Sequence, residues 1–480
     1  MKNKSENLLT NGEKIVDLNG NEHIIEKRIG GGGQGDIYST KDPSIALKIN
    51  KKDDNNELFE TLIRLPIPRN INITLPIAIL KEKSGYVMAF LEKMIPFEKS
   101  FGKNLSYQKD EIISSWLKSF NKEETETMFN DFYNYQKTGG KLKRLLAYLK
   151  CGIVMAKLHT NGLVYCDFST NNVFISENRK YNNVYFIDAD NLNFQEYTKR
   201  QGYYTPWFAA PEVIAGGGCT YYSDDYSLIL SFFWDLIGIH PFKGQKLDTE
   251  NDFDSENFGD NLEEKVMNGE LPWIRDKEDS SNFKDNGTYD LLVRENSELD
   301  ILFDRTFSKK GKENRITRPT SFEIIYEIIK EFDRTIKCKN CEMEYVMENE
   351  ENKCPWCDYE NNKILKISTF KLYSDNRKIK IWDFVEEINN ENDELSIPVR
   401  IVEDFLIDRL EEELFKIKLN DRGIVICYFN EEFDFRIEDD KNNKKLFEKI
   451  NIENKSTVHL ICNKKNNQFI KNILIEVEII

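Results

Sequence analysis

The chain has 480 residues, 83 acidic and 67 basic side chains, and a formal net charge of −16 at pH 7. This excess of acid, without a basic cluster, argues against a nucleic-acid partner. Hydrophobic residues make up 40% of the chain, which is enough for packed cores. Uncharged apolar stretches of about 18 residues or more are absent, and the first residues lack an apolar segment, so we expect a cytoplasmic protein without a membrane span.

The first motif in the chain is rich in glycine. Gly30, Gly32 and Gly35 fit the pattern G-x-G-x-x-G-x-[VI], in which backbone N–H groups approach phosphates without a Cβ in the way. The pattern alone is also typical of an ordinary turn. Alternating residues at 36–40 and 44–49 then predict two strands. A dinucleotide-binding fingerprint would open a helix here, and a Walker A loop would continue Gly-Lys-[Ser/Thr], so both are excluded.

Lys48 lies in the second of these strands, in an Ala-Leu-Lys unit that begins at Ala46. A lysine at this place matches the one that pairs with the α- and β-phosphates in protein kinases, although an ordinary surface lysine is the alternative. The helix expected over residues 56–65 offers Glu57 or Glu60 as its partner. Glu57 is favoured because the leucines of the helix then form an apolar stripe beside it. Either glutamate could instead belong to a solvated face.

The most informative segment begins at Asp167, a carboxylate five positions before the amide of Asn172, and an apolar strand follows. Sixteen residues after Asn172, a second apolar strand ends at Asp188. One carboxylate that orients a hydroxyl, with an amide and an acid that bind magnesium, is the set that phosphoryl transfer requires. The order and spacing of these residues behind a glycine loop and a lysine therefore indicate a phosphotransferase.

With these motifs, the chain resembles the eukaryotic-like Ser/Thr protein kinases of bacteria over about residues 22 to 335. An Ala-Pro-Glu motif ending at Glu212 resembles the end of their activation segment, and the resemblance pairs Glu212 with Arg318. The segment from Tyr86 to Leu91 resembles the strand and hinge that receive adenine. Small-molecule phosphotransferases usually lack the Ala-Pro-Glu motif and its arginine. A protein substrate that carries Ser or Thr is therefore favoured.

The resemblance implies roles for the matching positions. Lys48, oriented by Glu57, would hold ATP phosphates, Asp167 would orient or deprotonate the substrate hydroxyl, and Asn172 and Asp188 would bind Mg²⁺. The implied catalytic residues are Asp167, Lys48 and Asn172. The implied ATP- and Mg²⁺-binding residues are Gly30, Gly32, Gly35, Ile37, Ala46, Lys48, Glu57, Met88, Phe90, Asn172 and Asp188.

Four of the residues in these motifs, Cys166, Ser169, Ala189 and Asp190, depart from the pattern of these kinases. Cys166 stands where an arginine usually precedes the catalytic acid, and Ser169 stands where a lysine usually lies near the γ-phosphate. Ala189 and Asp190 replace the Phe-Gly pair after Asp188, so that Asp190 adds a second acid. In this the chain resembles a soluble bacterial subset with Asp-x-Asp and a Cys-rich tail. The departures leave two alternatives to an active protein kinase: a pseudokinase scaffold that binds nucleotide or partners without turnover, and a small-molecule phosphotransferase.

Four of the nine cysteines are spaced C-x₂-C-x₁₂-C-x₂-C: Cys338, Cys341, Cys354 and Cys357. Each C-x₂-C places two thiolates on one tight turn, and two such turns complete a tetrahedral Zn²⁺ site. Two disulfides or free thiols are the alternative, which a reducing cytosol disfavours. We predict a structural zinc ribbon over residues 336–362. The remaining cysteines are interpreted as buried apolar side chains.

The chain before the ribbon is expected to contain a polar leader, 1–21, and a kinase-like domain, 22–335. The small lobe would cover 22–95 and the large lobe 96–335. Within the large lobe, residues 97–140 are interpreted as a helical insert and 243–290 as a long surface insertion. Helices are expected from Lys141 to Thr160 and from Ser223 onward.

Residues 363–480 contain seven short alternating segments with turn residues between them, a pattern that suggests a small β-sandwich. A catalytic constellation is not evident there, so we interpret this domain as an interaction or regulatory module for a partner. The predicted fold class is α+β: a bilobal kinase-like domain, a small zinc ribbon and a C-terminal all-β domain. The predicted function is ATP- and Mg²⁺-dependent phosphorylation of protein Ser or Thr hydroxyls.

Overall fold

The structure is a computed structural model of the whole chain. It describes residues 8–31, 35–51, 56–102, 125–178, 180–196, 204–250, 259–284, 289–347, 353–360, 364–373, 375, 377–388, 394–403, 407–420, 423–437, 450–453, 457–465 and 473–480. The chain forms two compact units. The first comprises residues 1–104, 147–286 and 300–325, and the second comprises 105–146, 287–299 and 326–480. None of the described helices is both long and apolar enough to cross a membrane.

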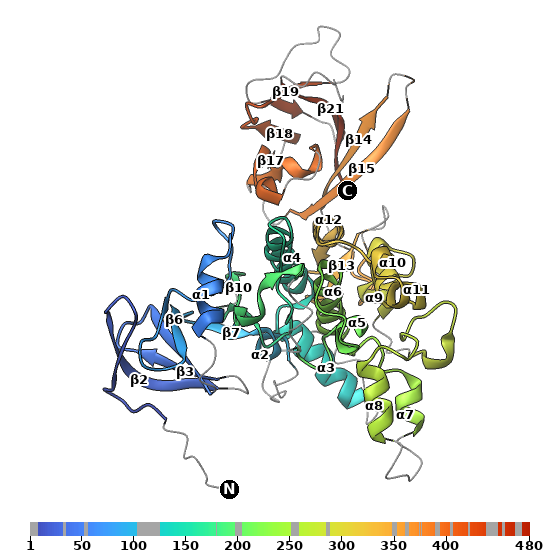
Figure 1. Ribbon diagram of the computed structural model, residues 1–480. Coiled ribbons are helices and arrows are strands. Elements are labelled where there is room, and N and C mark those ends of the chain that lie inside the picture. The colour runs from blue at the N-terminus through green and yellow to red at the C-terminus, as the bar shows by residue number, and fades with distance from the viewer. Residues whose placement is uncertain are drawn as a thin grey trace. The chain divides into compact units, whose positions relative to one another are not determined.

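The first unit begins with a six-stranded antiparallel sheet in the order β1-β2-β3-β4-β6-β5 (Figure 1). Its strands are β1 (Lys14–Val16), β2 (Glu22–Gly31), β3 (Gly35–Thr40), β4 (Ile45–Asn50), β5 (Ala78–Ile79) and β6 (Gly85–Ala89). The alternating pattern buries Tyr38 and Leu47 in a core beside one face of the sheet. Helix α1 (Asn56–Arg64) follows β4. The predicted hairpin and helix are therefore confirmed, and β1 forms within the stretch expected to be a polar leader.

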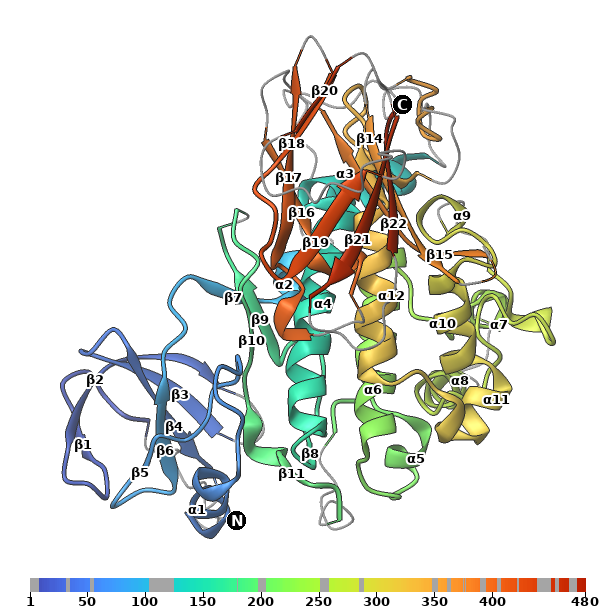
Figure 2. The ribbon, with the colours of Figure 1, turned by 90° about the horizontal axis from the view of Figure 1, so that it is seen from above.

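The first unit also contains α6 (Tyr221–Ile237) and most of α4 (Gly140–His159), which lie side by side (Figure 2). Tyr148 packs on Phe232 with ring centroids 5.1 Å apart, and its hydroxyl donates to Asp235 over 2.6 Å. Thr220 caps the start of α6, and Gly238, with a φ of 83°, ends it. Both helices match the predicted ones.

The first unit also contains short strands and helices. The strands form the sheets β10-β9-β7 and β11-β8: β7 (Met94–Pro96), β8 (Leu163–Val164), β9 (Val173–Ser176), β10 (Val184–Phe186) and β11 (Asn193–Phe194). The helices are α2 (Phe97–Phe101), η2 (Ala189–Asn191), α5 (Pro211–Ile214), α7 (Gln245–Glu250), α8 (Gly259–Met267), η4 (Ser280–Asn282), most of α10 (Glu298–Phe307), α11 (Lys309–Glu313) and η5 (Arg315–Thr317). Helix α9 (Tyr289–Leu292) belongs to the second unit, and α12 (Ser321–Asp333) has residues in both units.

The interpretation of residues 243–290 as a long surface insertion is wrong for much of its described part. Trp273 is fully buried against Phe233 of α6 and Phe307 of α10, and Val266 of α8 is also buried. The segment is rich in Asp and Asn, but a few large apolar side chains suffice to bury it. It is therefore part of the lobe core.

The second unit contains α3 (Thr125–Lys137), a two-stranded ribbon and two larger sheets. The ribbon pairs β12 (Thr335–Lys337) with β13 (Glu344–Val346). One sheet has the order β15-β14-β22-β21-β19 and the other β16-β17-β18-β20. Their strands are β14 (Ile364–Leu372), β15 (Lys378–Glu387), β16 (Glu394–Pro398), β17 (Glu413–Asn420), β18 (Gly423–Cys427), β19 (Phe433–Ile437), β20 (Ile450–Glu453), β21 (Thr457–Lys464) and β22 (Ile473–Ile479), with η6 (Val399–Ile401) and η7 (Ile407–Arg409) between them.

The prediction of a β-rich C-terminal region is confirmed, although β19 and β20 were not among the seven predicted segments. Within the unit, the fully buried carboxylate of Asp333 accepts hydrogen bonds from Arg400 Nε (2.8 Å), Arg400 Nη2 (2.6 Å) and Trp382 Nε1 (2.9 Å). These hydrogen bonds join the end of α12 to β15 and η6.

Candidate functional site

The predicted lysine lies at the centre of a buried polar cluster. Lys48, on β4, donates hydrogen bonds to Asp188 and to Asp190 Oδ2, the latter over 2.6 Å. Tyr86, which faces Lys48 on the neighbouring strand β6, donates to Asp190 Oδ1 over 2.8 Å. Lys48 and the two acids are 140 and 142 positions apart in the sequence. The fold therefore brings the sheet and the Asp-x-Asp motif together.

The charges of this cluster stabilise one another. Burial acts to lower the pKa of Lys48, but Asp188 and Asp190 outweigh it, so the pKa lies above its ordinary value and the side chain stays cationic. For Asp190, burial raises the pKa and is opposed by the ammonium of Lys48. Asp188 has a left-handed backbone, with a φ of 55°, and its side chain is 29% exposed against 8% for Asp190. Asp188 is thus the acid that is more open to a ligand.

Asp167 lies in the loop between β8 and β9, whose backbone is held from α6. Asp224 accepts hydrogen bonds from the N–H groups of Tyr165 (2.7 Å) and Cys166 (2.9 Å). Cys166 adopts a left-handed conformation with a φ of 72°, which an L-residue rarely takes without such support. The buried helix α6 therefore fixes the turn that presents Asp167.

The carboxylate of Asp167 is oriented by two residues. Asn172 donates from Nδ2 to its Oδ2 over 3.1 Å, and Thr205 donates to its Oδ1 from the backbone N–H (2.8 Å) and from the hydroxyl (2.6 Å). Burial raises the pKa of Asp167, and the hydrogen bonds from Thr205 oppose this shift. A backbone hydrogen bond of 2.9 Å from Ile187 N to the carbonyl of Asn172 links this loop to the strand that leads to Asp188.

Several of the residues that were expected to contact the nucleotide pair with one another across neighbouring strands of the sheet. Ile37 pairs with Gly30 on one side and with Lys48 on the other, and Ala46 pairs with Met88 on β6. The structure describes some of the other predicted residues only in part. Phe90 follows β6 and is partly buried, Gly35 begins β3, Gly32 lies outside the described residues, and the side chain of Glu57 lies outside the described side chains.

Gly35 is required for steric reasons, since an added Cβ would lie 2.6 Å from the carbonyl oxygen of Ile49. Glu60, the alternative partner of Lys48, is exposed and lies 3.6 Å from Arg64 one helical turn away. Ser169 is fully buried, and its hydroxyl has no hydrogen-bond partner among the described residues. The departure at this position therefore places a small buried group where a lysine was expected.

Three sets of contacts were not predicted from the sequence: those of Thr205 with Asp167, those of Asp224 with the backbone before Asp167, and that of Tyr86 with Asp190. Thr205 precedes the Ala-Pro-Glu motif by only a few residues, which is a usable signal, but its contact with Asp167 spans 38 positions. The predicted pairing of Arg318 with Glu212 is confirmed. The two guanidinium nitrogens donate to the two carboxylate oxygens over 2.8 and 2.9 Å.

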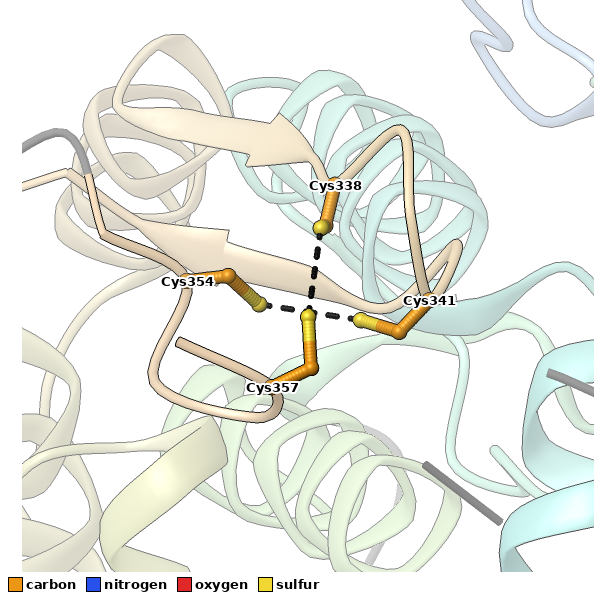
Figure 3. Close-up of side chains that lie close together, drawn as sticks. All are labelled: Cys338, Cys341, Cys354 and Cys357. Carbon is orange, nitrogen blue, oxygen red and sulfur yellow. Dashed lines mark hydrogen bonds between the residues drawn. The ribbon is translucent and has the colours of Figure 1, made fainter. Parts of the chain in front are cut away.

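The four cysteines of the predicted zinc ribbon converge. Their Sγ atoms all lie within 4.8 Å of one another, and Figure 3 shows the four side chains pointing toward one another. Cys338 and Cys341 follow β12, while Cys354 and Cys357 lie on the second turn. All four thiols are free, so four soft donors in a closed set fit a tetrahedral Zn²⁺ ion.

The second unit holds this ribbon through further contacts. Gln136 of α3 donates to the carbonyl of Cys341 over 3.0 Å, and Trp356 donates to the carbonyl of Glu344 over 3.2 Å. The carboxylate of Glu344 accepts the N–H of Leu142 in the first turn of α4, over 3.1 Å. A carboxylate at this end of a helix is favoured by the helix dipole and by unsatisfied N–H groups.

Residues 88–320 match the family model of the protein kinase domain. No curated protein matches the chain. The match supports a protein kinase that acts on proteins, and such domains generally use ATP and Mg²⁺. It confirms the predicted fold class together with the sheet-rich C-terminal region and the cysteine cluster. The glycine segment and Lys48 precede the matched residues, so their assignment depends on the contacts described above.

Proposed function

We propose that the protein is a Ser/Thr protein kinase that transfers the γ-phosphate of ATP to a protein hydroxyl. The observation that supports this most is the contact of Lys48 with Asp188, in a fold that also links Asp188 to the loop of Asp167 and Asn172. One ammonium, two carboxylates and one amide from distant parts of the chain thus occupy one region of the first unit. Phosphoryl transfer depends mainly on such positioning and on charge.

In this proposal each side chain has one task. Lys48 binds the α- and β-phosphates, and Asn172 and Asp188 are the oxygen donors for Mg²⁺. The metal neutralises charge on the transferring group when it is bound. Asp167 accepts the proton of the substrate hydroxyl or orients it, a role worth on the order of 10²–10⁴ in rate. Asn172 and Thr205 hold the carboxylate of Asp167 in place for this task.

The Gly30-to-Gly35 segment would cover the phosphates, and Ile37, Ala46, Met88 and Phe90 would contact the nucleoside. Glu57 stays a proposed partner of Lys48 through the family resemblance. Asp224 of α6 is a positioning residue, because it acts through the backbone N–H groups of Tyr165 and Cys166.

The accessory modules complete the proposal. A structural Zn²⁺ at Cys338, Cys341, Cys354 and Cys357 would stabilise the ribbon, and the β domain would recruit a regulatory partner. We also propose a bacterial, cytoplasmic protein of the Asp-x-Asp subset.

The proposal is tested by nucleotide binding and phosphate transfer measured on the same samples. Wild type, Asp167→Asn and the control Asp375→Asn, at an exposed site of the β domain, are mixed with labelled ATP, Mg²⁺ and protein substrates. We expect binding by all three and transfer by wild type and the control, with a loss of about 100-fold or more in Asp167→Asn. Binding without transfer by wild type would instead select a pseudokinase, and transfer only to sugars or antibiotics a small-molecule phosphotransferase.

A further inference from the structure

Asp190 uses both of its carboxylate oxygens within the buried cluster. Oδ2 accepts from Lys48 over 2.6 Å, and Oδ1 accepts from the hydroxyl of Tyr86 over 2.8 Å. The side chain of Asp190 is 8% exposed and that of Lys48 is 6% exposed. A buried carboxylate with two such donors has a fixed orientation, because any rotation would leave a buried polar group without a partner.

Helix α1 contributes an aromatic residue to the surroundings of this cluster. Phe59 of α1 is fully buried and contacts the ring of Tyr86, with centroids 4.8 Å apart. Glu60, the next residue, faces solvent beside Arg64. Among the described side chains, the anions at Lys48 thus come from the Asp-x-Asp motif.

We propose that Asp190 is a positioning residue for Lys48, supported by Tyr86. The inference rests on the proposed function, since it concerns how Lys48 is presented to nucleotide phosphates. It identifies the second acid of the Asp-x-Asp motif as an anchor for the lysine.

The two acids of the motif differ in exposure, as their different proposed roles require. Asp188 is the more exposed of the pair and is the proposed donor for Mg²⁺, so its contact with Lys48 is given up when it binds the metal. Asp190 is enclosed by Tyr86 and keeps its contact. An ammonium held by one fixed anion remains extended toward a ligand instead of turning to solvent. Tyr86 ensures this because its hydroxyl occupies the second oxygen of Asp190.

The inference predicts opposite behaviour from two carboxylates. Asp190→Asn removes the anion that holds Lys48 and leaves the lysine to Asp188 alone. Nucleotide then binds more weakly, even though a negative charge near the phosphates has been removed. Glu60→Gln changes an exposed carboxylate of α1 that pairs with Arg64. Tyr86→Phe deletes only one hydroxyl and loosens Asp190 without changing any charge.

The experiment measures ADP affinity by calorimetry in EDTA, so that the readout depends on neither Mg²⁺ nor turnover. We expect affinity to fall by about 10–100-fold in Asp190→Asn, the loss that follows from one charge-assisted hydrogen bond, and by about threefold to tenfold in Tyr86→Phe. Glu60→Gln should bind within about twofold of wild type. Melting temperatures are recorded for each variant, and Tyr86→Phe carries the test if Asp190→Asn does not fold.

A second measurement distinguishes a specific loss of Lys48 positioning from a general loss of structure in the site. In turnover assays with casein as substrate, Asp190→Asn should raise the KM for ATP while leaving the KM for casein within about twofold. Affinity in Asp190→Asn equal to or tighter than wild type, or a loss in Glu60→Gln as large as in Asp190→Asn, would overturn the inference. If wild type binds ADP but transfers no phosphate, the proposed function fails while the binding series still decides the role of Asp190.

Discussion

Replacing Arg318 by alanine should destabilise the first unit strongly. The guanidinium is fully buried and binds both carboxylate oxygens of Glu212, and its Nε also donates to the carbonyl of Gly311 over 2.8 Å. Removal leaves Glu212, 20% exposed, without its counter-charge. Breaking a buried pair in this way costs about 3–5 kcal/mol. A unit of this size loses about 2–4 °C per kcal/mol, so the melting temperature should fall by about 6–20 °C.

Thermal unfolding followed by tryptophan fluorescence checks this prediction. Arg315→Ala is the matched control, because Arg315 lies three positions away and is exposed; it should change stability by less than about 0.5 kcal/mol. Arg318→Lys keeps the charge but loses the two-pronged geometry, so it should fall between the two. If Arg318→Ala melted within about 2 °C of Arg315→Ala, the reasoning that the pair anchors the Ala-Pro-Glu motif would be refuted.

Three further outcomes are expected. Cys354→Ser should release Zn²⁺ and unfold the ribbon, because zinc binding supplies about 10–16 kcal/mol of folding free energy in comparable peptides. ATP binding should stay intact. Metal analysis checks the zinc content, and calorimetry checks ATP binding. Thr205→Val removes the hydroxyl that holds Asp167 and should lower kcat by about tenfold in a transfer assay, because a hydrogen bond to a charged group is lost. Asp333→Asn should cost about 3–5 kcal/mol in urea unfolding of the second unit, since Arg400 then lacks its counter-charge.

Each of these changes has a control in the chain. Cys462→Ser alters a thiol outside the cluster and should leave the zinc content unchanged; zinc retained in Cys354→Ser would contradict the predicted site. Thr205→Ser keeps the hydroxyl and should retain most of the rate, so equal losses in Ser and Val variants would argue against the orienting role. Asp375→Asn breaks an exposed pair with Arg377 and should cost less than about 1 kcal/mol, and an equal cost at Asp333 would count against burial as the cause.

Local patterns in the sequence predicted most of the elements that carry the site. The alternation around Lys48 gave its strand, and the apolar pattern before and after Asp167 gave the helix and strand that flank it. Arg318 and Glu212 were paired through the family resemblance and meet as expected. The strands and the helix depend on periodicity, which a single sequence contains, whereas the Arg318–Glu212 pair depends on the family resemblance.

The residues that were missed depend on contacts between distant segments. Asp190 meets Lys48 and Tyr86 across 142 and 104 positions of the sequence, and no local pattern specifies such contacts. Thr205 reaches Asp167 only because the intervening segment folds back. Trp273 was assigned to a surface insertion because its neighbours are polar, but one buried indole outweighs them.

Asp167 is proposed to act in the transfer of phosphate from ATP to protein hydroxyls. This role is tested by mass spectrometry of a protein substrate after incubation with ATP and Mg²⁺, with Asp167→Asn run in parallel. We expect phosphoserine or phosphothreonine with wild type, and at least about 100-fold less with Asp167→Asn. Equal phosphorylation by both proteins, or none by a wild type that binds ATP, would contradict it.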